Sequence, residues 1–302
     1  MAGKIKSEKA VKTEFKYIEE NEEWVESKSY TISYSEFDNN GNMIIEKAFN
    51  SVGEFHEFNE YQYDEKGFLI EKVIYLDEDE VAERAQYTND ETGKPLKKTT
   101  IYQESSEDYT EYFYNAEGNI IEKIRKDDDG YVEEREAVEY EGKLLVAQYS
   151  YGLDNVLLQK STFKYDEAGN SISNIYEDYL GSDRSRIDYA YNEAGLKEKM
   201  LTYNSEGHLV SKTLYEYDEK KRIVEVIEED RTSYKMSKMT YNDNDNVILQ
   251  EEFDKEDNLT LSIDRTYNEA FDIVKSAVFI ESSGQEVAQY YEVDYEYELT
   301  EE

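Results

Sequence analysis

Acidic and amide side chains are the residues of this chain best suited to chemistry, because they gather at short turns where a hard cation could be held. Three such clusters are Asp38-Asn39-Asn40-Gly41, Asp127-Asp128-Asp129-Gly130 and Asn242-Asp243-Asn244-Asp245-Asn246. Calcium prefers oxygen ligands of this kind. The candidate metal ligands are Asp127, Asp129, Asp243 and Asp245.

The same clusters have a second reading, because Asp and Asn also open turns by bonding their own backbone. Their spacing matches neither an EF-hand loop nor a glycine-rich calcium repeat. Weak calcium binding and plain turns therefore both stay open, and no other cofactor is expected.

Residues for catalysis are scarce. The chain has no cysteine, and its only histidines, His56 and His208, have no evident partner for nucleophilic chemistry. No glycine-rich phosphate loop is present. With 72 Asp and Glu residues, neighbouring carboxylates are everywhere and point to no particular site. We expect the chain not to be an enzyme.

Aromatic residues supply a second kind of candidate site. An aromatic residue ahead of a turn recurs about every 26 residues from Phe37 to Tyr267, a period typical of tandem repeats. Cross-strand packing alone would explain such a ladder, and the alternative is that its rings stack on a sugar or a partner protein. The candidate binding residues are Tyr63, Tyr114, Tyr140, Tyr165, Tyr191, Tyr217, Tyr241 and Tyr267.

The elements that carry these residues are β-strands. Turn signals recur too often to leave room for helices, and the segments between them are rich in Tyr, Ile, Val and Thr. Strands joined by tight turns are antiparallel neighbours. The sequence predicts an all-β fold, an antiparallel meander of about 20 strands built from tandem two-strand repeats, in an elongated or coiled sheet. Residues 1–16 are expected to be a charged tail or edge cap, and residues 17–302 one continuous repeat domain.

The net charge of the chain limits the classes of molecule that it can bind. The net charge of −38 disfavours nucleic acids and anionic membrane surfaces. No apolar run is long enough for a spanning helix or a signal-peptide core. We expect neither nucleic-acid nor membrane binding, and a cytoplasmic location, with an exported form after processing left open.

The repeat unit resembles a known family. The segment Tyr61-Gln62-Tyr63-Asp64-Glu65-Lys66-Gly67-Phe68-Leu69 is similar to the YD repeats of RHS proteins, and about ten such units follow in phase. The resemblance implies β-sheet shells or carbohydrate-associated stalks. The family's proline-containing self-cleavage signature is absent, since Pro95 is the only proline, and no toxin domain follows. MORN units are a second, poorer resemblance.

Together these features predict a non-enzymatic scaffold that presents a tyrosine-rich, acidic surface to a basic protein, in a shell, chaperone or immunity-like role. The alternative is a module that binds carbohydrate or cell wall through its aromatic ladder.

Overall fold

The computed structural model describes residues 4–103, 106–281 and 287–300, and within them the chain forms 22 β-strands and one short 3-10 helix. The predicted all-β, antiparallel meander is confirmed. The strands fall into two units. The first comprises Met1–Ala82, Ile223–Glu225 and Lys235–Glu302, and the second comprises Glu83–Arg222 and Val226–Tyr234.

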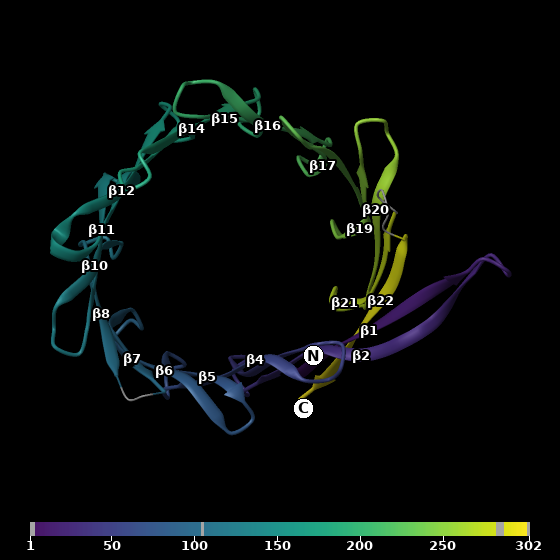
Figure 1. Ribbon diagram of the computed structural model, residues 1–302, viewed down its shortest axis with the longest axis horizontal. Helices are drawn as coiled ribbons and strands as arrows, with labels where there is room; N and C mark the ends of the chain where they lie inside the picture. Colours follow the sequence, from purple (N-terminus) through teal and green to yellow (C-terminus); the bar gives the residue numbers. More distant parts are fainter. Residues whose placement is uncertain (1–3, 104–105, 282–286, 301–302) are drawn as a thin grey trace. The chain divides into compact units, whose positions relative to one another are not determined.

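The first unit contains the strands from both ends of the chain. They are β1 (Ile5–Ile18), β2 (Glu23–Phe37), β3 (Met43–Phe49), β4 (Phe55–Tyr63), β5 (Leu69–Asp77), β18 (Tyr234–Tyr241), β19 (Val247–Phe253), β20 (Leu259–Tyr267), β21 (Ile273–Ile280) and β22 (Gln289–Leu299). From β1 to β5 and from β18 to β22, each strand pairs antiparallel with the next. β1 also pairs antiparallel with β22, and Figure 1 shows the two side by side.

The pairing of β1 with β22 corrects the predicted open sheet. It runs from Ile5 opposite Leu299 to Phe15 opposite Tyr290 and joins the first strand to the last. β1 therefore lies between β2 and β22, and β22 lies between β21 and β1, so neither terminal strand is a sheet edge. An open, elongated or coiled sheet is wrong for this chain. The N-terminal segment, expected as a tail or edge cap, contributes most of β1.

The second unit is a meander of consecutive strands. They are β6 (Glu80–Asn89), β7 (Pro95–Tyr102), β8 (Glu107–Tyr114), β9 (Ile120–Lys126), β10 (Val132–Glu141), β11 (Leu144–Tyr151), β12 (Leu157–Tyr165), β13 (Ser171–Asp178), β14 (Asp183–Tyr191), β15 (Lys197–Tyr203) and β16 (Leu209–Tyr217). Each pairs antiparallel with the next. The 3-10 helix η1 (Leu153–Asn155) links β11 to β12. β17 (Ile223–Asp230) is divided between the two units, and the first three residues of β6 belong to the first unit.

The first residue of each tight turn stabilises it by accepting backbone hydrogen bonds. Asp64 accepts the backbone N–H groups of Lys66 and Phe68 on Oδ1, each at 2.9 Å. Gly67 closes the turn at φ +84°, where a side chain would be strained. Four turns place another residue at this point, Lys221, Asp245, Asp257 and Phe271, all at positive φ.

Few side chains of the described residues are buried in either unit. The buried ones include Phe58 and Val73 in the first unit and Ala85 and Ala147 in the second. Most strand residues are half-buried, as expected for a sheet whose side chains cover one another across neighbouring strands. Among the described residues, no helix has the length and apolarity to cross a membrane.

Candidate functional site

The eight candidate tyrosines share one position in the fold. Each lies at the end of a strand or one residue before it, beside a tight turn, and donates its hydroxyl to a backbone carbonyl of the preceding repeat. Tyr165 bonds the carbonyl of Leu145 at 2.7 Å, and Tyr217 bonds that of Lys197 at 2.6 Å. The other carbonyl acceptors are Met43 for Tyr63, Pro95 for Tyr114, Ile120 for Tyr140, Ser171 for Tyr191, Ile223 for Tyr241 and Val247 for Tyr267.

A β-bulge helps to aim these rings. The strand register shifts between Lys164 and Tyr165, and between Ala190 and Tyr191, as it does at most ladder positions. Such a bulge redirects the side chain that follows it. Burial raises the pKa of Tyr63, Tyr114, Tyr191 and Tyr217. The hydroxyls thus form hydrogen bonds within the fold. A binding role for the rings stays a prediction.

The candidate metal ligands lie in two of the tight turns. Asp127 uses Oδ1 to accept the N–H of Tyr131 at 2.8 Å, and Asp129 precedes the turn glycine Gly130. Asp243 and Asp245 lie in the turn between β18 and β19, with Asp245 at φ +65°. Within the described ranges, no group of three or more His, Cys, Asp or Glu side chains is placed to hold a metal ion.

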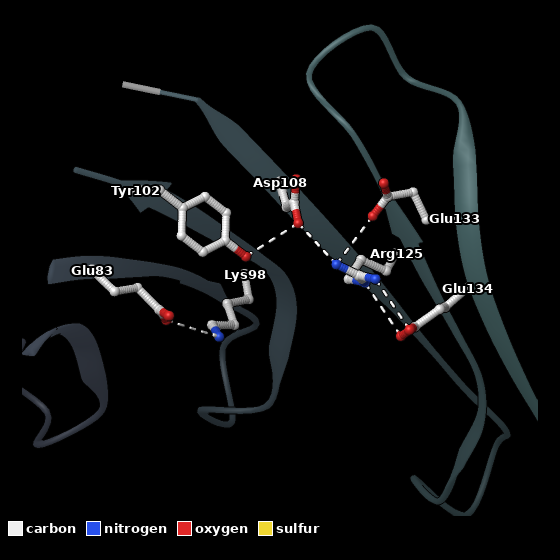
Figure 2. Close-up of polar contacts among 7 residues, drawn as sticks. All are labelled: Glu83, Lys98, Tyr102, Asp108, Arg125, Glu133 and Glu134. Atoms are coloured by element: carbon white, nitrogen blue, oxygen red, sulfur yellow. Dashed lines mark hydrogen bonds and ion pairs between the residues drawn. The ribbon is translucent and has the colours of Figure 1, made fainter. Parts of the chain in front are cut away.

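The second unit contains a network of ion pairs centred on Arg125 of β9 (Figure 2). Its guanidinium contacts Asp108 on β8 at 2.9 Å, and Glu133 and Glu134 on β10 at 3.0 and 3.1 Å. Tyr102 donates its hydroxyl to Asp108 at 3.2 Å. Burial alone would lower the pKa of Arg125, but the three carboxylates together raise it. One cation therefore ties three neighbouring strands together.

Similar ion pairs link the adjacent strands. Lys98 on β7 lies 3.7 Å from Glu83 on β6, as Figure 2 also shows. Lys126 on β9 lies 2.6 Å from Glu111 on β8. Each carboxylate meets a cation from a neighbouring strand, so these contacts are explained by sheet pairing.

A pocket of about 590 Å³ is a different kind of feature. It lies in the second unit, between the turn that leads into β16 and the end of β17. It is lined by Asn204, Glu206, His208, Leu209, Val210, Ser211, Lys212, Glu229, Asp230 and Arg231. Both signs of charge and two exposed apolar side chains meet here, with Leu209 51% and Val210 39% exposed.

Most charges of the pocket already have partners. Lys212 lies 2.8 Å from Glu229, and Nδ1 of His208 lies 3.1 Å from Glu206. The backbone N–H and hydroxyl groups of the following residues, Thr232 and Ser233, lower the pKa of Asp230 to about 2.

Arg231 differs from these groups. It is exposed and forms no hydrogen bond or ion pair with any residue that the structure describes. Its guanidinium is available to a ligand. The second histidine, His56, is an exposed residue of β4 and does not line this pocket.

Sequence reasoning found His208 but not the pocket around it. The only local signal is the turn Asp230-Arg231-Thr232-Ser233, in which the carboxylate of Asp230 accepts the backbone N–H groups of Thr232 and Ser233 and leaves the arginine outside. Nothing in the spacing shows that this turn and Glu206 line the same pocket, because they come from turns that are separate in the sequence.

Comparison with known proteins gives a likeness to solved structures but no family. No protein-family model and no curated protein matches the chain. Among solved structures, the chain is similar to a porin-like protein from Bacteroides uniformis, with 10% sequence identity and a TM-score of 0.33 over 99% of this chain and 98% of that chain.

These findings correct several expectations. The resemblance to YD repeats has no matching family model, and the likeness found is to a porin-like protein instead. This likeness contradicts the predicted scaffold function and its carbohydrate-binding alternative. It also contradicts the predicted basic protein partner, the predicted absence of membrane binding and the predicted cytoplasmic location. The scaffold function also relied on an open sheet, which the pairing of β1 with β22 rules out.

Proposed function

We propose that the chain binds a small zwitterionic solute, such as a short aliphatic peptide, in the pocket between β16 and β17, without chemical change to the solute. The observation that carries this proposal is Arg231, an exposed cation without a partner among the described residues, at the rim of a pocket that also holds carboxylates and apolar side chains.

Each part of such a solute has a matching group. A carboxylate fits the guanidinium of Arg231, which can donate two parallel hydrogen bonds. An aliphatic body covers Leu209 and Val210, both exposed in the free protein. The ammonium group fits the carboxylates of Glu206 and Asp230. The volume of about 590 Å³ lies within the range of small-ligand sites.

The net charge of the chain favours a zwitterion over a simple anion. At −38, the protein repels a small anion before it reaches Arg231. A zwitterion carries no net charge and is not repelled, yet it still offers a carboxylate to the arginine.

Calorimetric titration with the dipeptide dileucine tests the proposal. We expect saturable binding that Arg231→Gln weakens at least tenfold, roughly the loss of a charge-assisted hydrogen bond. Arg184→Gln is the matched control, because Arg184 is an exposed arginine outside the pocket, 3.7 Å from Glu177. Equal binding by the two variants, or no binding by the unchanged protein to dileucine or to other aliphatic dipeptides, would overturn the proposal.

A second variant separates the apolar part of the site from the charged part. Leu209→Asp places a charge where the aliphatic body should lie, on a side chain that is already 51% exposed. We expect it to weaken dileucine binding more than diglycine binding, since diglycine has no aliphatic side chains to lose.

A further inference from the structure

The seam between β1 and β22 differs from the other strand pairings described within the two units. Those pairings join strands that follow one another in the chain, so a short connection holds them together. The seam joins residues near the two ends of the chain, and only non-covalent contacts hold it. It can therefore separate without breaking any hairpin.

Charge complementarity supplies part of its stability. β1 carries four lysines against two glutamates, whereas β22 carries three glutamates and one aspartate. Lys6 lies 2.8 Å from Glu298, and Lys9 lies 3.0 Å from Glu296. Lys12 lies over the ring of Tyr291, 4.1 Å from its centre. The side chains of both ion pairs are between 39% and 62% exposed, so salt screens them.

If the seam opened, β1 and β22 would become sheet edges, each still paired with its other neighbour. β1 would stay paired with β2, and β22 would stay paired with β21, where Lys275 lies 2.7 Å from Glu292. Exposed strand edges of this length are templates for pairing with another chain. Because every copy would present both a basic β1 edge and an acidic β22 edge, the best complement to either is the other edge of a second copy.

We propose that the seam is an interface for a second copy of this chain, in which β1 of one molecule pairs with β22 of another in the register seen here. Closure within one molecule competes with exchange, and the balance moves toward exchange as protein concentration rises. Salt weakens the ion pairs of the seam and so favours its opening, and return to low salt allows either pairing to form again.

Single-cysteine variants test the exchange, because the natural chain has no cysteine. Val11 and Asp294 lie opposite each other across the seam, at a separation that a disulfide can bridge. The Val11→Cys and Asp294→Cys proteins are mixed at high concentration, incubated in high salt, returned to low salt and oxidised. We expect a mixed disulfide dimer at a yield at least tenfold above that of Val52→Cys mixed with Asp294→Cys, since Val52 is 71% exposed and outside the seam.

The double variant Val11→Cys/Asp294→Cys is the folding control. Oxidised at low concentration before the salt step, it should form an internal disulfide, stay monomeric and yield at least tenfold less dimer than the mixed single variants. If it forms the internal disulfide while the mixed variants give no more dimer than the control pair, the proposal is wrong. Failure of the internal disulfide would also overturn it, because the register of the seam would then be incorrect.

Discussion

At the scale of single residues, the tyrosine hydroxyls explain why the ladder is made of tyrosine rather than phenylalanine. A phenylalanine would provide the same ring for cross-strand packing, but it would lack the hydroxyl that donates to a backbone carbonyl of the preceding repeat. Tyr165 and Leu145 illustrate the arrangement, with the hydroxyl 2.7 Å from the carbonyl oxygen. The ladder therefore connects successive repeats by hydrogen bonds as well as by packing.

We expect Tyr165→Phe to destabilise the protein by about 1 kcal/mol, the net value of one hydrogen bond. Urea unfolding monitored by circular dichroism would measure the change. Tyr176→Phe is the control, because no hydrogen bond links the Tyr176 hydroxyl to another described residue, and its effect should be near zero. Equal effects of the two substitutions would mean that the ladder hydroxyls do not stabilise the fold.

A second residue-scale prediction concerns the turn that begins at Asn242. In three comparable turns, the amide nitrogen of the last Asn donates to an Asp at the first position, as Asn170 does to Asp166 at 2.9 Å. Asn242 replaces that Asp, and Nδ2 of Asn246 is left buried without a partner. We expect Asn242→Asp to restore the bond and stabilise the protein by about 0.5–1.5 kcal/mol.

Thermal unfolding at neutral pH would show this gain as a higher midpoint. The reverse change, Asp166→Asn, removes the corresponding bond to Asn170 and should lower the midpoint. A lower midpoint for Asn242→Asp would mean that the added negative charge outweighs the new hydrogen bond on a chain of −38.

At the scale of the element, the turns without glycine store backbone strain. Phe271 adopts φ +71° at the position where most turns have glycine, and its side chain is 55% exposed. The left-handed conformation costs an ordinary residue about 1–2 kcal/mol. Because little burial is lost, we expect Phe271→Gly to stabilise the protein by about 1 kcal/mol in chemical unfolding.

Gly195→Ala makes the opposite change in a matched turn. Gly195 has φ +75° and open space where a Cβ would lie, so backbone strain alone should destabilise this variant. If Phe271→Gly is neutral while Gly195→Ala destabilises, the ring of Phe271 contributes contacts that offset its strain.

The Arg125 network gives another prediction at this scale. Arg125→Gln leaves Asp108, Glu133 and Glu134 close together without their shared cation, so we expect lower stability at low ionic strength. The arginine side chain is 36% exposed, and salt should reduce the loss. Unfolding at low and high salt would measure it, with Arg184→Gln, which has one distant partner, as the weaker control. A loss that salt leaves unchanged would point to packing rather than charge.

The sequence predicts these elements well because their signals are local. The strands from β2 to β21 lie between turns whose Asp, Asn and Gly residues are read directly from the repeat. The pairing of β1 with β22 has no such signal, since Phe15 and Tyr290 are neighbours only through the fold. The pocket was missed for the same reason, because Glu206 and Arg231 come from different turns.

At the scale of the whole molecule, stability depends on carboxylates at low pH and on tyrosines at high pH. The turn residues Asp38, Asp90, Asp166, Asp218 and Asp254 have lowered pKa values, mostly through the hydrogen bonds that they accept. A lowered pKa in the folded state means that the contribution is present above the ordinary value near 4 and is lost as these groups take up protons. Acid should therefore open the turns across the whole chain.

Alkali should act in part through β22, the strand that pairs with both β1 and β21. Burial raises the pKa of Tyr290 and of Tyr297 from the ordinary value of 10.0 to about 12. The folded state thus retains protons that the unfolded chain releases, and this contribution is complete below pH 10 and is lost as the pH rises to about 12. We expect the free energy of unfolding to fall over this interval, as measured by urea titrations at successive pH values. A Tyr290→Phe/Tyr297→Phe variant should fall less steeply, and an equal slope would show that other tyrosines set the alkaline limit.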